Sequence, residues 1–148
     1  MFEIFHRSRK GDIIHTDIYD AALQGDDQAV ALLGAALLTG IGTDRDIERG
    51  ISLLKGAASR GNALAARSLV HAFLTENYGM LDFEQGIPYL RQSASYGEPE
   101  SLYNLGMMML EGTQFVEKDV ISARALIKES ADKGYDKAVR MMAARFGA

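Results

Sequence analysis

The chain of 148 residues contains no cysteine and no tryptophan, and only two prolines. The absence of cysteine excludes disulfides, thiolate metal sites and cysteine nucleophiles, and it suits a reducing compartment. No apolar run is long enough for a membrane-spanning helix or for the hydrophobic part of a secretory signal. We therefore expect a cytoplasmic protein with no membrane-bound segment.

Charge and motifs exclude further classes of function. The formal net charge is −4 and the pI about 5.3, so the basic surface that nucleic acids require is not expected. His6, His15 and His71 do not have the spacing of a zinc site. Ser68 lies one helical turn before His71, but no orienting acid accompanies the pair. We predict no catalytic residue, no metal site and no cofactor.

What the chain does have is an internal repeat. Gly25, Gly61, Gly97 and Gly134 recur at steps of 36, 36 and 37 residues, each preceded by a pair of small residues. A fixed period of this size indicates one supersecondary unit that is copied and stacked. The length is that of a single domain.

Residues 27–62 show what one unit contains. Asp27 is a candidate cap for a first helix, called helix A, whose apolar residues recur at helical spacing. A glycine-containing loop follows, a second helix (helix B) begins at Asp46, and Gly61 is expected to end it in a left-handed conformation. Gly34 leaves room for a neighbouring helix. The predicted A helices are 27–39, 63–76, 99–111 and 136–146, and the predicted B helices are 12–24, 46–60, 82–96 and 119–133.

The same spacing divides the single predicted domain, residues 1–148. The chain begins and ends on half-repeats, because the first B helix has no A helix before it and the last A helix has no B helix after it. The predicted parts are an N-terminal tail or cap (1–11), a half-repeat (12–26), three full repeats (27–62, 63–98 and 99–135) and a C-terminal half-repeat (136–148).

The two prolines test this register. Pro99 falls in the first turn of an A helix, where its missing N–H costs nothing. Pro88 falls well inside the third B helix, where it should either kink the helix or delay its start. The sequence leaves these two outcomes open.

Residues 101–112 closely resemble the first helix of a Sel1-like repeat, whose pattern is A-x-Y-x-L-G-x-x-Y-x-x-G. Asp119, Ala123, Ala131 and Gly134 match the second half of that pattern, D-x-x-x-A…A-A-x-x-G. The middle repeat departs most, since Val70 replaces the glycine of Leu-Gly. The resemblance implies an all-α fold, a right-handed α/α superhelix (α-solenoid) of about eight helices related to tetratricopeptide repeats.

The resemblance also implies a function. Such proteins are generally adaptors that hold another protein or a peptide, and they share no catalytic residues. The partner is expected on a concave face lined by the A helices, opposite their core-facing side. We place Ala31 and Leu38 on that open side as well. The predicted partner-binding residues are Arg67, Ser68, His71, Tyr103, Asn104, Met107, Arg140 and Met141.

Several alternatives stay open. Tyr103 can instead be a half-buried residue that only packs against its neighbours. Arg67 and Arg140 can be solvated side chains with no role in binding. The terminal helix either folds back with Phe146 inserted or forms a self-association edge. The basic, aromatic N-terminus is either a cap or a docking tail for an acidic partner. The chain can also be a fragment of a longer repeat array.

Two other functions compete with the adaptor. Small bacterial Sel1-like proteins include some that act as immunity proteins, each neutralising a cognate toxin. A different class is a hydrolase of cell-wall or β-lactam substrates. That link depends on cysteine-rich secreted relatives, whereas this chain has no cysteine.

Overall fold

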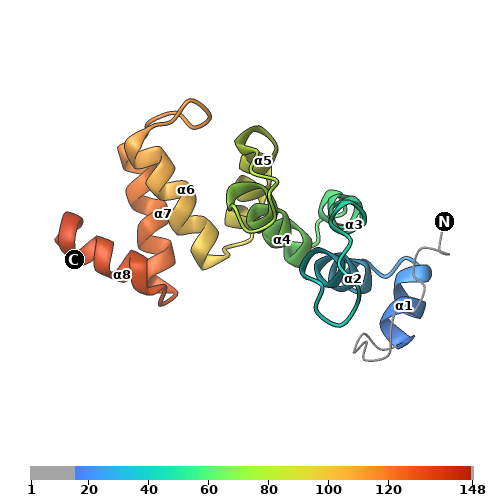
Figure 1. Ribbon diagram of the computed structural model, residues 1–148. Helices are drawn as coiled ribbons and strands as arrows, with labels where there is room; N and C mark the ends of the chain where they lie inside the picture. Colours follow the sequence, from blue (N-terminus) through green and yellow to red (C-terminus); the bar gives the residue numbers. More distant parts are fainter. Residues whose placement is uncertain (1–15, 148) are drawn as a thin grey trace. The chain divides into compact units, whose positions relative to one another are not determined.

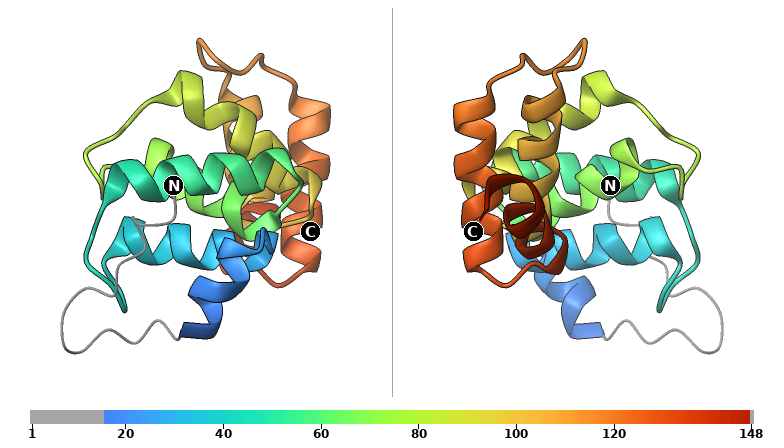
Figure 2. Two further views of the ribbon diagram at one scale, coloured as in Figure 1. Left: turned by 90° about the vertical axis from the view of Figure 1, so that its right-hand side faces the viewer. Right: turned by 90° about the vertical axis from the view of Figure 1, so that its left-hand side faces the viewer.

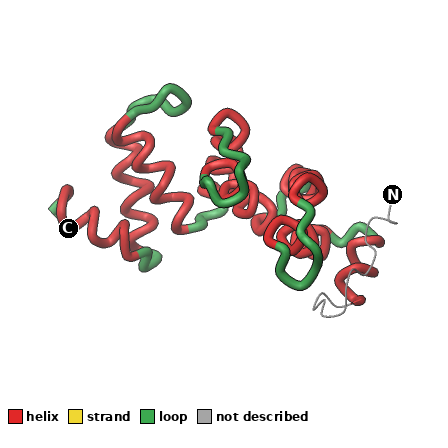
Figure 3. The backbone as a smooth tube through the Cα atoms, in the orientation of Figure 1, coloured by secondary structure: helices red, strands yellow, loops and turns green. Residues whose placement is uncertain are grey.

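The structure is a computed structural model that describes residues 16–147. All regular secondary structure in this range is α-helical, with no strand among the described residues (Figure 3). The prediction of an all-α fold is therefore confirmed. The helices are α1 (Thr16–Leu23), α2 (Asp27–Thr39), α3 (Ile47–Ser59), α4 (Ala63–Leu74), α5 (Phe83–Ser95), α6 (Pro99–Glu111), α7 (Val120–Asp132) and α8 (Asp136–Phe146).

The chain forms two compact units that divide after Leu81. In the first unit, α2 packs against α1, α3 and α4, and α3 also packs against α4 (Figure 1). In the second unit, α6 packs against α5 and α7, and α7 packs against α8. Figure 2 shows from two sides that α2 and α3 lie side by side, as do α6 and α7. Each of these two pairs is one A helix with the B helix that follows it.

The B helices of the three full repeats begin in the same way. The carboxylates of Asp46, Asp82 and Asp119 each accept a hydrogen bond from the backbone N–H three residues later, at 3.2, 3.0 and 3.0 Å. An N-cap of this kind contributes about 1 kcal/mol to helix stability. The prediction that Asp46 starts its helix is confirmed.

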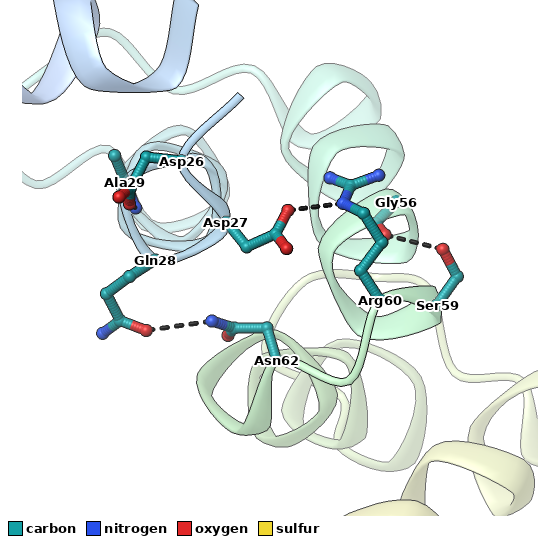
Figure 4. Close-up of polar contacts among 8 residues, drawn as sticks. All are labelled: Asp26, Asp27, Gln28, Ala29, Gly56, Ser59, Arg60 and Asn62. Atoms are coloured by element: carbon teal, nitrogen blue, oxygen red, sulfur yellow. Dashed lines mark hydrogen bonds and ion pairs between the residues drawn. The ribbon is translucent and has the colours of Figure 1, made fainter. Parts of the chain in front are cut away.

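The first A helix, α2, is capped one residue earlier than the sequence suggested. The caps are the residues directly after the repeat glycine: Asp26 accepts from the Ala29 N–H at 2.8 Å and Asn62 from the Ala65 N–H at 2.9 Å. The prediction that Asp27 caps α2 is wrong. Asp27 is the first residue inside the helix, and its carboxylate accepts instead from the guanidinium of Arg60 at the end of α3 (Figure 4).

The turn from each B helix to the next A helix depends on the repeat glycine. Gly25, Gly61, Gly97 and Gly134 have φ values of +83°, +89°, +78° and +86°, as predicted for Gly61. After α3, the Gly61 N–H donates to Ala58 O at 2.9 Å and the Asn62 N–H donates to Ala57 O at 3.0 Å. These two bonds satisfy carbonyls that a helix end otherwise leaves unpaired. Equivalent pairs of bonds close the other three turns.

Two further glycines bring α2 and α3 into backbone contact. A Cβ atom at Gly50 would lie 2.8 Å from the carbonyl oxygen of Gly34, and one at Gly34 would lie 2.8 Å from Cγ of Leu54. Gly34 therefore gives the neighbouring helix room, as predicted.

Both prolines are accommodated inside helices. Pro99 is the first residue of α6, as predicted, and Glu98 before it is the N-cap. Helix α5 begins at Phe83 and continues through Pro88 to Ser95, so Pro88 does not delay the helix. Pro88 lies on the exposed side of this helix, away from the core.

In the described range, residues 16–147, no helix is both long and apolar enough to cross a lipid bilayer.

The turn geometry yields a stability prediction. Gly61→Ala should lower the free energy of unfolding by about 1–2 kcal/mol, because alanine is strained at a φ of +89°. Gly56→Ala, in the same helix, is the matched control. Its added Cβ would lie an ordinary 3.5 Å from Arg60, so helix propensity should raise stability by about 0.5–1 kcal/mol.

Chemical denaturation of the three proteins measures both effects. Equal stability of Gly61→Ala and the parent would contradict the role assigned to the glycine turn.

Candidate functional site

The eight predicted partner-binding residues all lie on A helices, but they are divided between the two units. Each group is described by itself. Arg67, Ser68 and His71 lie on α4 in the first unit, Tyr103, Asn104 and Met107 lie on α6 in the second, and Arg140 and Met141 lie on α8 in the second.

In the first unit, the surface of α4 is polar and tied to α2. Arg67 is exposed, while Ser68 and His71 are half-buried. The Asn62 amide at the start of α4 donates to Oε1 of Gln28 on α2 at 2.9 Å (Figure 4). Next to Gln28 in sequence, Asp27 pairs with Arg60. The Asn62–Gln28 bond joins the N-terminal ends of α4 and α2, and the Arg60–Asp27 pair joins the end of α3 to the start of α2.

The open side of α2 is narrower than the sequence suggested. Ala31 and Leu38 were expected there, but both are buried, with exposed fractions of 0% and 1%. The reason is that α2 is surrounded by three helices, α1, α3 and α4. Leu38 lies against α3, where its backbone N–H is 2.9 Å from the position of a Cβ on Gly50. Helix α4 also packs on α2, and the small Ala31 side chain has no exposed surface in this arrangement.

In the second unit, an aromatic pair joins α6 to the start of α8. The ring of Tyr103 lies against that of Tyr135, with centroids 5.5 Å apart and a 53° angle between the planes. Tyr103 is half-buried, which agrees with its alternative reading as packing. Met107 and Met141 are also partly buried and rest on the core cluster formed by Leu110, Ala123, Ile127, Ala138 and Met142.

Tyr135 was not among the predicted residues. It occupies the N-cap position of α8, where the other A helices have Asp26, Asn62 and Glu98, but it makes no side-chain cap hydrogen bond. The signal that could have found it is this break in the pattern: an aromatic residue replaces a capping residue directly after the repeat glycine.

The surroundings of Tyr135 disfavour its ionised form. Burial raises the pKa of the Tyr135 phenol above its ordinary value, and the nearby Glu100, Tyr103 and Glu98 raise it further. Glu98 is itself held in place, since it accepts from the backbone N–H groups of Ser101 at 2.7 Å and Glu100 at 3.3 Å. Two tyrosine rings and two carboxylates thus meet at one corner of the second unit.

The two ends of α8 differ. Near its start, Arg140 is exposed and pairs with Asp136 at 2.5 Å, an exposed ion pair of little energetic weight. Near its end, Phe146 is partly buried on the core cluster, and the guanidinium of Arg124 lies 5.5 Å from its ring centroid. Phe146 therefore packs on the second unit, while the alternative that α8 is a self-association edge stays a prediction.

The remaining predictions concern metal binding and the N-terminal segment. Among residues 16–147, no group of three or more histidine and acidic side chains is placed to hold a metal ion. His6, His15 and the N-terminal segment 1–11, read as a cap or docking tail, lie outside the described residues.

Comparison with known proteins decides the family. The family model described as Sel1 repeat matches residues 27–62 and 99–135, which are the α2–α3 and α6–α7 pairs with their turns. This chain is a Sel1-repeat protein. No match was found among curated proteins.

Solved structures of similar fold agree with the family. A Sel1 repeat protein from Oxalobacter formigenes is 25% identical with a TM-score of 0.73, and the match covers 85% of this chain and 94% of that one. A protective antigen of uropathogenic Escherichia coli with an SLR fold is 23% identical with a TM-score of 0.72. That match covers 88% of this chain but only 28% of the antigen. The predicted α-solenoid fold class is therefore confirmed.

The Sel1-repeat fold is typically a scaffold for protein interaction. The features of this Sel1-repeat protein that suit such a role are the exposed polar side of α4 and the corner of the second unit around Tyr103 and Tyr135.

The Tyr135 environment can be tested by titration. The difference in phenolate absorbance between the parent and Tyr135→Phe should have a midpoint above pH 10.0. Glu100→Gln should move this midpoint down, because a neighbouring negative charge disfavours the phenolate. Since the folded state holds this proton more tightly, its contribution to stability should be lost as the pH rises above about 10.

Glu117→Gln, at an exposed position in the loop before α7, is the control and should leave the midpoint unchanged. A midpoint at or below 10.0 in the parent would show that the site is solvated.

Proposed function

We propose that this Sel1-repeat protein is a non-enzymatic adaptor that holds another protein on the face lined by its A helices. In helical-repeat proteins this face forms an extended concave surface. The observation that carries the proposal is the Tyr103–Tyr135 pair, two half-buried rings that pack against each other at the edge of the core of the second unit. Tyrosine and arginine are the residue types that most often dominate binding energy at interfaces.

The chemistry of this corner favours a basic residue from the partner. The rings of Tyr103 and Tyr135 offer π faces, and Glu98 and Glu100 lie close enough to Tyr135 to affect its ionisation. A lysine or arginine would gain from both the rings and the carboxylates. The net charge of −4 would also attract a basic partner at long range. Met107 and Met141 add an adaptable apolar surface beside the pair.

Three residues should carry much of the affinity. Replacing Arg67, Tyr103 and Arg140 together by alanine should weaken capture of the native partner by about 100-fold or more, since hot-spot truncations each cost about 2 kcal/mol. The measurement is affinity capture from the source cell, followed by titration of the captured partner against both proteins.

A matched variant controls for charge and folding. Arg49, Arg91 and Tyr96 are exposed and lie on or at the end of B helices, so their joint replacement by alanine removes the same residue types from a different surface. This control should bind as the parent does. Equal capture by both triple variants would remove the A-helix face as the binding surface.

Affinity capture and a substrate screen together separate the competing functions. A toxin recovered in a tight one-to-one complex would identify the adaptor as an immunity protein. Turnover of an ester or lactam substrate that is lost in His71→Ala would instead overturn the non-enzymatic proposal.

A further inference from the structure

Helix α8 buries only one of the two faces that the other A helices bury. Towards α7, Ala138 and Met142 have exposed fractions of 0% and 5%. On the adjacent face, Val139 is 45% exposed and Ala143 is also exposed. The repeat period relates Val139 to Val30, Ala66 and Leu102, and Ala143 to Gly34, Val70 and Gly106, and all six of these residues are buried.

The full repeats show which element covers this face. A Cβ at Gly34 would lie 2.8 Å from Cγ of Leu54, and a Cβ at Gly106 would lie 2.7 Å from Cγ1 of Ile127. Leu54 and Ile127 belong to the B helices of the same repeats. The exposed face of α8 is thus shaped to receive a B helix, and the described chain has no helix after α8.

Helix α1 is a B helix with the complementary face open. Ile18 and Ala21 are half-buried, although a B helix normally presents these two positions to the A helix before it. Their counterparts in the full repeats are buried, with exposed fractions of 0% or 1%. These counterparts are Leu54, Leu90 and Ile127 for Ile18, and Ala57, Ser93 and Ser130 for Ala21. Leu54 and Ile127 face glycines of the A helix before them, and Ser130 donates to Pro99 O of that helix.

We propose that α1 of a second copy of this chain packs on α8 and completes its repeat. The contact would continue the A–B packing that the chain already makes in its full repeats. Charge favours the same pairing: α1 carries Asp17 and Asp20 and no basic residue, whereas α8 carries Lys137, Arg140 and Arg145 against one aspartate. Because the two surfaces differ, the contact is head-to-tail. A pair of chains joined in this way still has one free α1 surface and one free α8 surface.

Sedimentation velocity of the 148-residue chain tests the proposal. The average mass should rise with protein concentration between about 10 μM and about 1 mM without reaching a fixed oligomer, as expected of a weak open-ended contact. The rise should be smaller at high salt, because the exposed charges are then screened.

Two substitutions should each block one end. Ala143→Glu places a charge on the receiving face of α8, and Ile18→Glu places one on the inserting face of α1. Each variant alone should associate about tenfold or more weakly than the parent over the same concentration range. An equimolar mixture of the two should form a one-to-one dimer, because each variant retains the end that the other lacks.

Ala125→Glu adds the same charge at an exposed position on α7 and should associate as the parent does. Circular dichroism checks that each variant is folded. If Ile18→Glu unfolds, Asp17→Lys with Asp20→Lys blocks the same end at exposed positions, and Val139→Glu is the equivalent second choice on α8.

Three results would overturn the proposal. They are a parent that remains monomeric over the whole concentration range, a mixture of blocked variants that forms no dimer, and an Ile18→Glu variant that still dimerises. The last result would indicate a symmetric contact between two α8 helices instead.

Discussion

The left-handed glycine that ends each B helix is the constraint on which the other contacts depend. With φ between +78° and +89° at Gly25, Gly61, Gly97 and Gly134, the next residue is placed to act twice. Its N–H donates to the third-last carbonyl of the B helix, and it is also the N-cap of the following A helix. One residue therefore ends one helix and begins the next, so the direction of the A helix is set within two residues of the B helix end.

Contacts between distant residues also tie the two ends of a repeat together. In two of the three full repeats the residue before the closing glycine reaches back to the region where the A helix begins: Arg60 pairs with Asp27, and the Lys133 ammonium donates to Gly97 O at 2.6 Å. Between these ends, small residues let the helices touch: Gly34 faces Gly50, and the buried Ser130 hydroxyl donates to Pro99 O at 2.6 Å. The contacts made by Arg60, Lys133 and Ser130 join residues 33, 36 and 31 positions apart, close to the length of one repeat.

The helices could be predicted closely because their signals are local. Asp46, Pro99 and Gly61 act through the backbone groups of their nearest neighbours, so their positions alone located helix ends. The residues of the candidate site were harder to predict from the sequence. Ala31 and Leu38 lie on what helical periodicity alone marks as an open face, but contacts from α3 and α4 cover them. Tyr135 was not predicted because it stands at a position that normally caps a helix. Its ring instead contacts Tyr103.

What the sequence determined by itself was the repeat: its period, its two helices and the glycine that separates them, since each follows from dihedral preference and from hydrogen bonds over a few residues. Only the tertiary structure decided which sides of those helices stay in contact with water. Exposure depends on how many neighbours surround each helix, and that number differs between equivalent positions such as Val30, which is buried, and Val139, which is 45% exposed. Equivalent repeat positions can therefore lie in the core in one copy and on the surface in another.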